Sequence, residues 1–373
     1  MSGHSLSEEA DPLYRPLGGL EPWSARPVDG PAWDGAVARI DALRTEDPDR
    51  AAMATRGAML AAAYQSAALD GVVAVDHDLA RSLVRGATSL ASLDSGARSH
   101  VRANLDALEM AGNAGMSEAT IRGIHDVACR PQLTHQVIVE GHMQDHVMAP
   151  GDYKHHPNHI RLDDGGWVAT APVALVGPEM ARLVELAAGP ECAALHPVTH
   201  AAWLHHSILH VQPFADGNGR VARALAGGVL LRAASVPLVS FDADGGVLPA
   251  VVALVDLMTA TDPGAVEAWR ARTAAAEDLL RQLVPALEAA LRRPDPVRRA
   301  DVSGATVGPE LVVRVPGVDV DEVLAIDAHP LDDGPISVTA REAGLRLVAG
   351  EPVEPWVDRV AAVLALRVAA ETE

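Results

Sequence analysis

The stretch from His210 to Ala224 has the residue types and spacing that best fit chemistry. An apolar helical pattern ends there, the loop Asp216-Gly217-Asn218-Gly219 follows, and a second helical pattern begins. Glycines let successive backbone N–H groups converge, and the N-terminus of the following helix adds a partial positive charge. Together these features predict an anion site that suits phosphate.

Charged side chains flank this loop. Arg220 and Arg223 are three residues apart, so they lie on one helical face near the mouth of the loop, where they can neutralise further phosphate charge. Asp216 can supply one carboxylate to a magnesium ion that otherwise keeps waters and phosphate oxygens. An ordinary helix-loop-helix turn with surface arginines has the same short pattern. A longer stretch of sequence is therefore needed to distinguish a phosphate site from such a turn.

Over Gln212–Arg223 the sequence resembles the motif of the Fic (Fido) domain family. That motif reads His, any residue, Phe, any residue, Asp or Glu, then Gly-Asn-Gly-Arg, two residues and Arg. This chain has Gln212-Pro213-Phe214-Ala215-Asp216-Gly217-Asn218-Gly219-Arg220-Val221-Ala222-Arg223, which differs only at the first fixed position. The resemblance extends to Leu105–Leu108, Ile124-His125 and Ala201–Val211, and it covers about residues 49–280.

The resemblance implies a role for each matching residue. Phe214 would anchor the loop in the core, and Asp216 would hold Mg²⁺. The implied nucleotide-binding residues are Phe214, Gly217, Asn218, Gly219, Arg220 and Arg223, and the implied catalytic positions are Gln212, Asp216, Asn218 and Arg220. Family members usually transfer AMP from ATP to a Ser, Thr or Tyr hydroxyl of a protein, with the motif histidine as general base. ATP, or another nucleotide, and Mg²⁺ are therefore the expected cofactors.

Gln212 stands where the motif histidine belongs. A carboxamide has no useful basicity near neutral pH, and loss of a general base typically slows a reaction by ~10²–10⁴-fold. On a helix, His210 points about 200° away from Gln212, so it is a weak substitute. The chain is then a slow transferase, a binding-only pseudoenzyme that senses a nucleotide, or an enzyme whose chemistry needs no base at this position.

Tyr64–Gly71 resembles the inhibitory motif that some Fic proteins carry N-terminal to the core: Ser or Thr, three residues, Glu, then Gly or Asn. Here the matching residues are Ser66, Asp70 and Gly71. In the family the glutamate pairs with the second motif arginine, here Arg223. Asp70 is one methylene shorter than glutamate. A plain helix end capped by Gly71 is the alternative.

Gly151–Ile160 resembles the segment that leads into the target-docking flap of the family, with Tyr153, Lys154, Asn158 and Ile160 as its marked residues. An extended segment of a target protein can pair with such an edge. An ordinary surface hairpin is the alternative.

Histidine pairs offer a rival site. His142 and His146 are four residues apart, as are His196 and His200, and His206 and His210. This spacing places two imidazoles on one helix face, as some zinc sites require. The segment at His142 lacks the glutamate of the zinc-protease helix. A zinc hydrolase is therefore the lesser alternative.

The amino-acid composition limits the partners and the cellular location that we expect. A formal charge of −20 repels nucleic-acid phosphates and anionic membranes, so we expect neither as a partner. The chain has only two cysteines, and its first residues lack a basic segment followed by an apolar run. We therefore expect a cytoplasmic location.

The pattern along the chain predicts a mainly α fold: a Fic-type helical core with a β-hairpin flap, plus a small C-terminal α+β module. An Asp-Gly between two β-type runs near residues 159–169 is the hairpin signal. The predicted parts are an extended N-terminal arm over 1–45, helices with the candidate inhibitory motif over 46–130, the core with its flap and phosphate loop over 131–292, and the module over 300–373.

Overall fold

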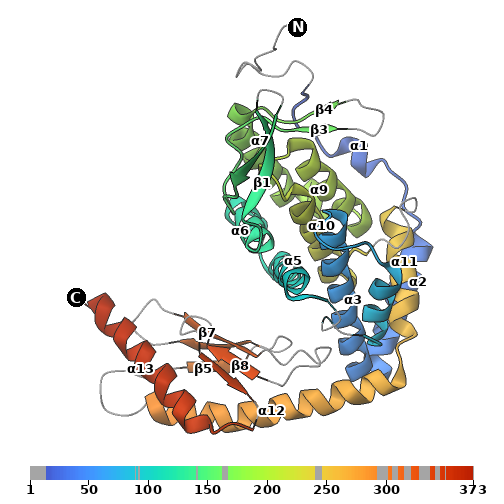
Figure 1. Ribbon diagram of the computed structural model, residues 1–373. Helices are drawn as coiled ribbons and strands as arrows, with labels where there is room; N and C mark the ends of the chain where they lie inside the picture. The colour runs from blue at the N-terminus through green and yellow to red at the C-terminus, as the bar shows by residue number, and fades with distance from the viewer. Residues whose placement is uncertain are drawn as a thin grey trace. The chain divides into compact units, whose positions relative to one another are not determined.

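The computed structural model describes residues 14–88, 90, 93–139, 142–161, 167–239, 246–291, 301–304, 310–314, 321–326, 337–340, 345–348 and 350–372. The chain divides into two compact units (Figure 1). The first holds residues up to 88 and residues 92–262, and the second holds 89–91 and 263–373. The division after residue 262 comes earlier than the predicted boundary at 292, because helix α12 packs with the tail.

The first unit is mainly helical. Its helices are α1 (Glu21–Ser24), α2 (Gly30–Glu46), α3 (Pro48–Leu69), α4 (His77–Arg85), α5 (Ser95–Asn113), α6 (Glu118–Cys129), α7 (Val173–Ala188), α8 (Pro190–Ala193), α9 (Pro197–Val211), α10 (Asn218–Ala234) and α11 (Val247–Thr259). Helix α10 is central and packs against α9, α5, α6 and α3 (Figure 1). The helices that flank the phosphate loop are thus held by the core.

Aspartate or serine side chains cap the starts of five of these helices. The first backbone N–H groups of α2, α3, α4, α5 and α6 donate to the side chains of Asp29, Asp47, Asp76, Asp94 and Ser117 respectively. Each cap satisfies an N–H group that has no partner within the helix.

The predicted extended arm over residues 1–45 is wrong for Gly30–Glu46, which form α2. Asp29 caps this helix and Pro31 stands in its first turn, where proline is tolerated. Trp33, Ile40 and Leu43 are buried on one side of it. The proline and glycine content of the segment hid this apolar face.

Glycines let α10 lie close to α5. A Cβ at Gly228 would meet the Ala111 carbonyl oxygen at 2.5 Å, and one at Gly227 would meet Leu108 Cδ1 at 2.7 Å. A larger side chain at Gly228 would displace the α5 backbone, whereas at Gly227 the Leu108 side chain would have to move. Close approach of these two helices explains the alanine-rich composition of this core.

Two antiparallel hairpins belong to the first unit. Strands β3 (His159–Arg161) and β4 (Trp167–Ala169) pair as predicted, and the turn between them lies outside the described residues. Strands β1 (Thr134–Val139) and β2 (His142–Val147) form a second hairpin. His142 and His146 lie on β2, so the helical zinc geometry considered for them is wrong.

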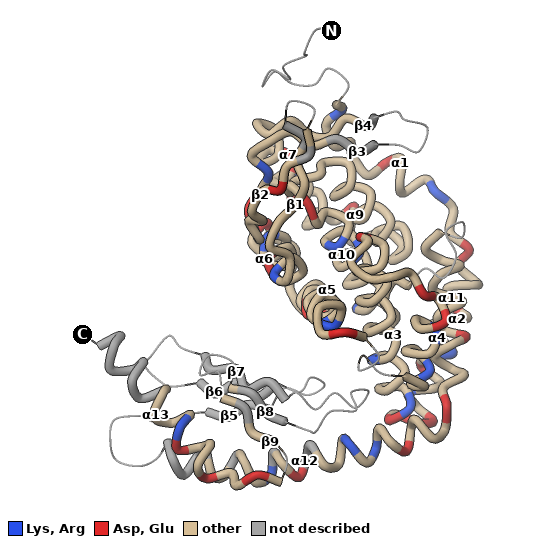
Figure 2. The backbone as a smooth tube through the Cα atoms, in the orientation of Figure 1, with Lys and Arg blue, Asp and Glu red and all other residues tan. Residues whose placement is uncertain are grey.

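The second unit contains α12 (Pro263–Leu291), a five-stranded antiparallel sheet and α13 (Val353–Thr372). The strands are β5 (Asp301–Gly304), β6 (Glu310–Arg314), β7 (Asp321–Ile326), β8 (Ser337–Ala340) and β9 (Leu345–Val348), paired in sequence order. Helix α13 packs on α12 and β9. Acidic and basic residues alternate along α12 (Figure 2). The predicted α+β character of the tail is present, with α12 added to it.

Within the described part of the chain, none of the helices alone has the length and apolar character to cross a membrane. Helix α11 and the first part of α12 meet that test only when taken together.

Candidate functional site

The predicted phosphate loop, residues 212–219, joins α9 to α10 and contains two residues with positive φ. Gln212 ends α9 at φ 49°, and Gly217 precedes α10 at φ 75°. A Cβ at Gly217 would collide with Cys129 Sγ and lie 3.2 Å from His125 Nε2. Only glycine therefore fits this position, for both conformation and space.

Phe214 anchors the loop in the core. Its side chain is fully buried and stacks on the His125 ring, with ring centroids 3.8 Å apart. The Asn218 side chain accepts from the Phe214 N–H at 2.9 Å and donates to the Phe214 carbonyl at 2.8 Å. Asn158 donates to the same carbonyl at 2.9 Å. These contacts hold the loop in one conformation.

His125 reaches the loop from α6. Its Nδ1 accepts from the Gly151 N–H at 2.8 Å, so its Nε2 carries the proton and donates to the Asp216 carbonyl at 3.0 Å. Burial lowers the pKa of His125 to about 4, and the charge of Arg220 also lowers it. The imidazole is therefore neutral at pH 7 and serves as a bridge between segments.

A cavity of about 790 Å³ opens over the loop and the first turn of α10. This size is typical of a small-ligand site. The lining residues are Asp70, Val72, His100, Pro131, Gln132, Leu133, Thr134, Gln136, Asn158, Gln212, Ala215, Asp216, Gly217, Asn218, Gly219 and Arg220. The first-turn N–H groups of α10 have no partner within the helix and lie at this cavity. An anion in the cavity would meet them directly.

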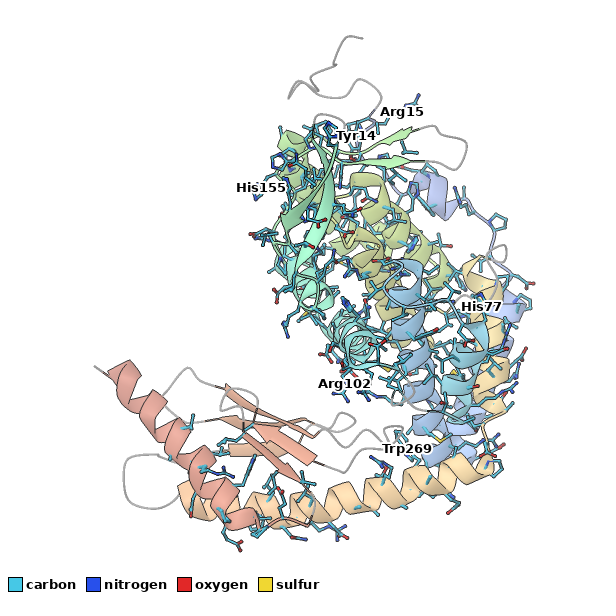
Figure 3. The ribbon with its side chains drawn as sticks, in the orientation of Figure 1. Tyr14, Arg15, His77, Arg102, His155 and Trp269 are labelled. Atoms are coloured by element: carbon cyan, nitrogen blue, oxygen red, sulfur yellow. The ribbon has the colours of Figure 1, made fainter. Side chains whose placement is uncertain are left out.

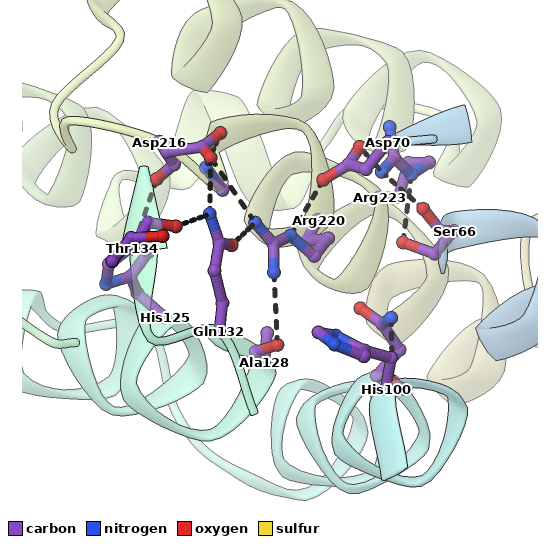
Figure 4. A network of polar contacts seen from close by, with 12 residues as sticks. Ser66, Asp70, His100, His125, Ala128, Gln132, Thr134, Asp216, Arg220 and Arg223 are labelled. Atoms are coloured by element: carbon purple, nitrogen blue, oxygen red, sulfur yellow. Dashed lines mark hydrogen bonds and ion pairs between the residues drawn. The ribbon is translucent and has the colours of Figure 1, made fainter. Parts of the chain in front are cut away.

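Asp70 holds both loop arginines (Figure 4). Its carboxylate lies 2.7 Å from Arg220 Nε, as an ion pair without hydrogen-bond geometry, and accepts from Arg223 Nη2 at 2.5 Å. Arg223 also donates to the Ser66 hydroxyl at 3.0 Å and to the Ser66 carbonyl at 2.9 Å. Gly71 follows with φ 74° and ends α3 at this point. The shorter aspartate thus reaches Arg223, and Arg220 in addition.

Asp216 faces the cavity beside Arg220. Burial would raise the pKa of its carboxyl group, but hydrogen bonds from Gln132 and the Gly217 N–H, together with the charge of Arg220, lower it. The carboxylate is ionised at neutral pH and nearly half of its side-chain surface is exposed. An ionised, cavity-facing carboxylate fits the single protein ligand of a magnesium ion that is otherwise held by waters and phosphate.

The motif position holds a glutamine, and neither sequence neighbour of Gln212 is a histidine. Gln212 itself lines the cavity. His210 Nε2 instead lies 2.6 Å from the Arg15 carbonyl, and the His210 ring stacks on Tyr14. Tyr14 and Arg15 lie at the end of the unit that carries β3 and β4 (Figure 3). The His210 ring is therefore held by contacts with Tyr14 and Arg15 of the N-terminal segment.

The four marked flap residues have different positions. Only Ile160 lies in a strand, β3. The Tyr153 hydroxyl lies 3.1 Å from Glu118 Oε2. Lys154 is buried, its backbone N–H donates to the Pro213 carbonyl, and its ammonium donates to Asn158 and Thr170. Lys154 and Asn158 therefore contact the loop at Pro213 and Phe214, and the docking role of the flap stays a prediction.

The described residues contain no group of three or more His, Cys, Asp or Glu side chains placed to hold a metal ion. His206 and His210 stack on each other along α9, and His196 caps that helix with Nδ1 accepting from the Val198 N–H. Cys129 and Cys192 are buried free thiols.

Among the cavity residues that sequence reasoning missed, two lie beside Arg220. Gln132 bridges Asp216 and Arg220 from the segment that leads into β1. His100 reaches the cavity from α5, close to Arg220 (Figure 4). Neither belongs to a recognisable motif. Only the packing of α5 and α6 on α10 brings them to the loop.

Parts of this chain are similar in sequence to known proteins. Residues 116–230 match the family model described as "Fic/DOC family". A stretch of 47 residues is 45% identical to a "Protein adenylyltransferase Fic" of Drosophila persimilis, and it covers 13% of this chain and 9% of that protein. A similar stretch of 46 residues is 46% identical to the Drosophila mojavensis protein of the same name, with 12% and 9% covered.

Solved structures superpose loosely. A Fic domain containing signaling protein from Bacteroides thetaiotaomicron is 19% identical with a TM-score of 0.44, covering 64% of this chain and 95% of that one. A Fic family protein from Desulfovibrio desulfuricans is 16% identical with a TM-score of 0.41, covering 71% and 81%. The match to known proteins is therefore carried by residues 116–230, which fit the Fic/DOC family model.

Proposed function

We propose that the first unit binds the polyphosphate of a nucleotide together with Mg²⁺. The observation that carries this proposal is the cavity over Ala215–Arg220, where first-turn N–H groups meet a buried guanidinium and an ionised carboxylate. Backbone donors and Arg220 suit the α- and β-phosphates, while Asp216 suits the cation. Bound Mg²⁺ would supply charge neutralisation to the phosphates.

The activity that this site fits is transfer of AMP from ATP to a protein hydroxyl, as the names of the Drosophila relatives suggest. Gln212 limits that activity because an amide cannot take the hydroxyl proton. His210 does not compensate, since its ring contacts Arg15 and Tyr14. The wild-type chain is then a restrained, slow transferase, and a nucleotide sensor without turnover is the second candidate.

Asp70 adds a restraint on nucleotide entry. It pairs with both arginines that phosphates would need, and its side chain is only 18% exposed. A bound polyphosphate must compete with this carboxylate for the two guanidinium groups. We therefore infer that the end of α3 inhibits the site in the free protein.

Calorimetry of the full chain with Mg²⁺ tests the proposal. ATP and ADP should bind more tightly than AMP, and adenosine should bind weakest, because affinity comes from the phosphates. Equal binding of adenosine and ADP, or binding of neither, would contradict a polyphosphate site. Labelled ATP separates the two candidate functions: labelled protein product supports the transferase, and binding without product supports the sensor.

A further inference from the structure

Within the part of the chain that the structure describes, the neutral Gln132 side chain bridges Asp216 and Arg220. Its Nε2 donates to Asp216 Oδ2 at 2.7 Å and to the Thr134 carbonyl at 3.0 Å. Its Oε1 accepts from Arg220 Nη2 at 2.5 Å. Both amide hydrogens and the amide oxygen are therefore engaged, which fixes the side chain (Figure 4).

The backbone places this amide. The Gln132 N–H donates to the Cys129 carbonyl at 2.9 Å, in the turn that joins α6 to β1. Arg220 contacts the same end of α6 through the Ala128 carbonyl, at 3.4 Å. The end of α6 thus positions the amide and the guanidinium together.

Arg220 and Asp216 carry opposite charges and stop just short of direct contact. Arg220 Nη2 lies 4.0 Å from Asp216 Oδ2, beyond the distance of a charge-assisted hydrogen bond. Arg220 is buried, so its attraction for Asp216 is weakly screened by solvent. The Gln132 amide gives each group a partner at the point where they would otherwise meet.

We propose that Gln132 is a positioning residue that holds the Arg220 guanidinium and the Asp216 carboxylate apart, as separate receptors for the phosphates and for the divalent cation of a bound nucleotide. This inference rests on the proposed function. Without the amide, the two groups would close into a direct ion pair. Each ligand would then have to break that pair before it could bind.

Variants of Gln132 separate this role from simple packing. Gln132→Met keeps the length of the side chain and removes its hydrogen bonds. Gln132→Glu keeps an acceptor for Arg220, removes the donor to Asp216 and adds a negative charge. Gln144 is exposed on β2, is not among the residues that line the cavity and, among the described contacts, shares no hydrogen bond with Asp216 or Arg220. Gln144→Met is therefore the control.

Binding of ADP and of Mn²⁺ to the 373-residue chain is the first test, by calorimetry and by electron paramagnetic resonance of free Mn²⁺. Gln132→Met should weaken the binding of each ligand about tenfold, while Gln144→Met should change neither. Gln132→Glu should strengthen Mn²⁺ binding and weaken ADP binding measured without metal. Equal effects of Gln132→Met and Gln144→Met, or the same sign for both ligands in Gln132→Glu, would overturn the proposal.

A crystal structure of Gln132→Met tests the spacing without any nucleotide. Arg220 and Asp216 should approach to about 2.8 Å. Side chains that stay about as far apart as in the wild type would overturn the spacing role. A wild-type chain that binds no ADP would instead overturn the proposed function and the ligand assignment, so the two failures are distinguishable.

Discussion

Asp70 Oδ2 lies 2.7 Å from Arg220 Nε, which ties the end of α3 to the first turn of α10. Arg220 is buried and cannot be satisfied by water, so this contact matters for the arginine as well as for access to the site. The same carboxylate also contacts Arg223. The Asp70 carboxylate therefore pairs with both guanidinium groups that a polyphosphate would bind.

Asp70→Asn should raise the affinity for ADP about tenfold, because the amide keeps the size of the side chain and removes its charge. Asparagine leaves Arg220 a hydrogen-bond acceptor, so the fold should persist. Asp41→Asn is the control, since Asp41 is an exposed residue that pairs only with Arg44 among the described ion pairs. Calorimetry that shows equal ADP affinity for Asp70→Asn and the wild type would contradict inhibition by α3.

Gln212→His should increase AMP transfer by about 10²–10⁴-fold, because it restores a general base at the motif position. The measurement is incorporation of labelled AMP into the chain itself and into hydroxyl-bearing test proteins, in the Asp70→Asn background. Gln136→His adds an imidazole elsewhere in the cavity and should give no increase. Fast transfer by the wild type, with no gain in Gln212→His, would show that a base at this position is not needed.

Gly217→Ala should destabilise the first unit by more than about 1–3 kcal/mol, because alanine is strained at this φ and its Cβ collides with Cys129. Gly35→Ala is the matched control. Gly35 lies inside α2, where an added Cβ would have no atom within 4 Å, so alanine should stabilise by about 1 kcal/mol. Urea unfolding measures both. A neutral Gly217→Ala would mean that the loop adopts another conformation.

Lys154 is the sole lysine of the sequence. Burial lowers the pKa of its ammonium group to about 7. The unfolded chain binds this proton up to about pH 10.5, so the free energy of unfolding should rise with pH between about 7 and 10, by up to about 1.4 kcal/mol per unit. Labelling with ¹³C-lysine gives one resonance, whose titration reports this pKa directly. Titration near 10.5 would contradict the burial.

The variant Lys154→Met is a second test of the lowered pKa of the Lys154 ammonium group. It removes the titration, so the rise in stability between pH 7 and 10 should flatten. It also releases Asn158, which the ammonium contacts at 2.6 Å and which donates to the Phe214 carbonyl. A pH profile identical to that of the wild type would show that another group produces the rise.

The phosphate loop was predictable because its requirements are local. A glycine at positive φ, a buried Phe214 and paired arginines on one helix turn all lie within one short stretch. The contact between Asp70 and Arg223 was expected from a spaced motif, although only the structure shows that Asp70 reaches two arginines. Each of these features is marked by residues at a fixed spacing within a short stretch, so the sequence alone reveals it.

Features that depend on tertiary packing were not predictable. Gln132 meets Asp216 only because α6 packs beside α10, and no pattern around Gln132 marks it. The second strand of the β1–β2 hairpin carries no clear signal, since His142–Val147 is polar and does not alternate clearly. Lys154 was marked only by its position before the flap, and its burial depends on long-range packing. In each case long-range contacts override the local signal.

The most direct test of a phosphate site is a crystal structure of Asp70→Asn with Mg²⁺ and ADP. Phosphate oxygens should lie about 3 Å from the Gly219 backbone nitrogen and from the Arg220 guanidinium, with the cation beside Asp216. ADP bound elsewhere, or a loop that contacts no phosphate at saturating ADP, would contradict the account.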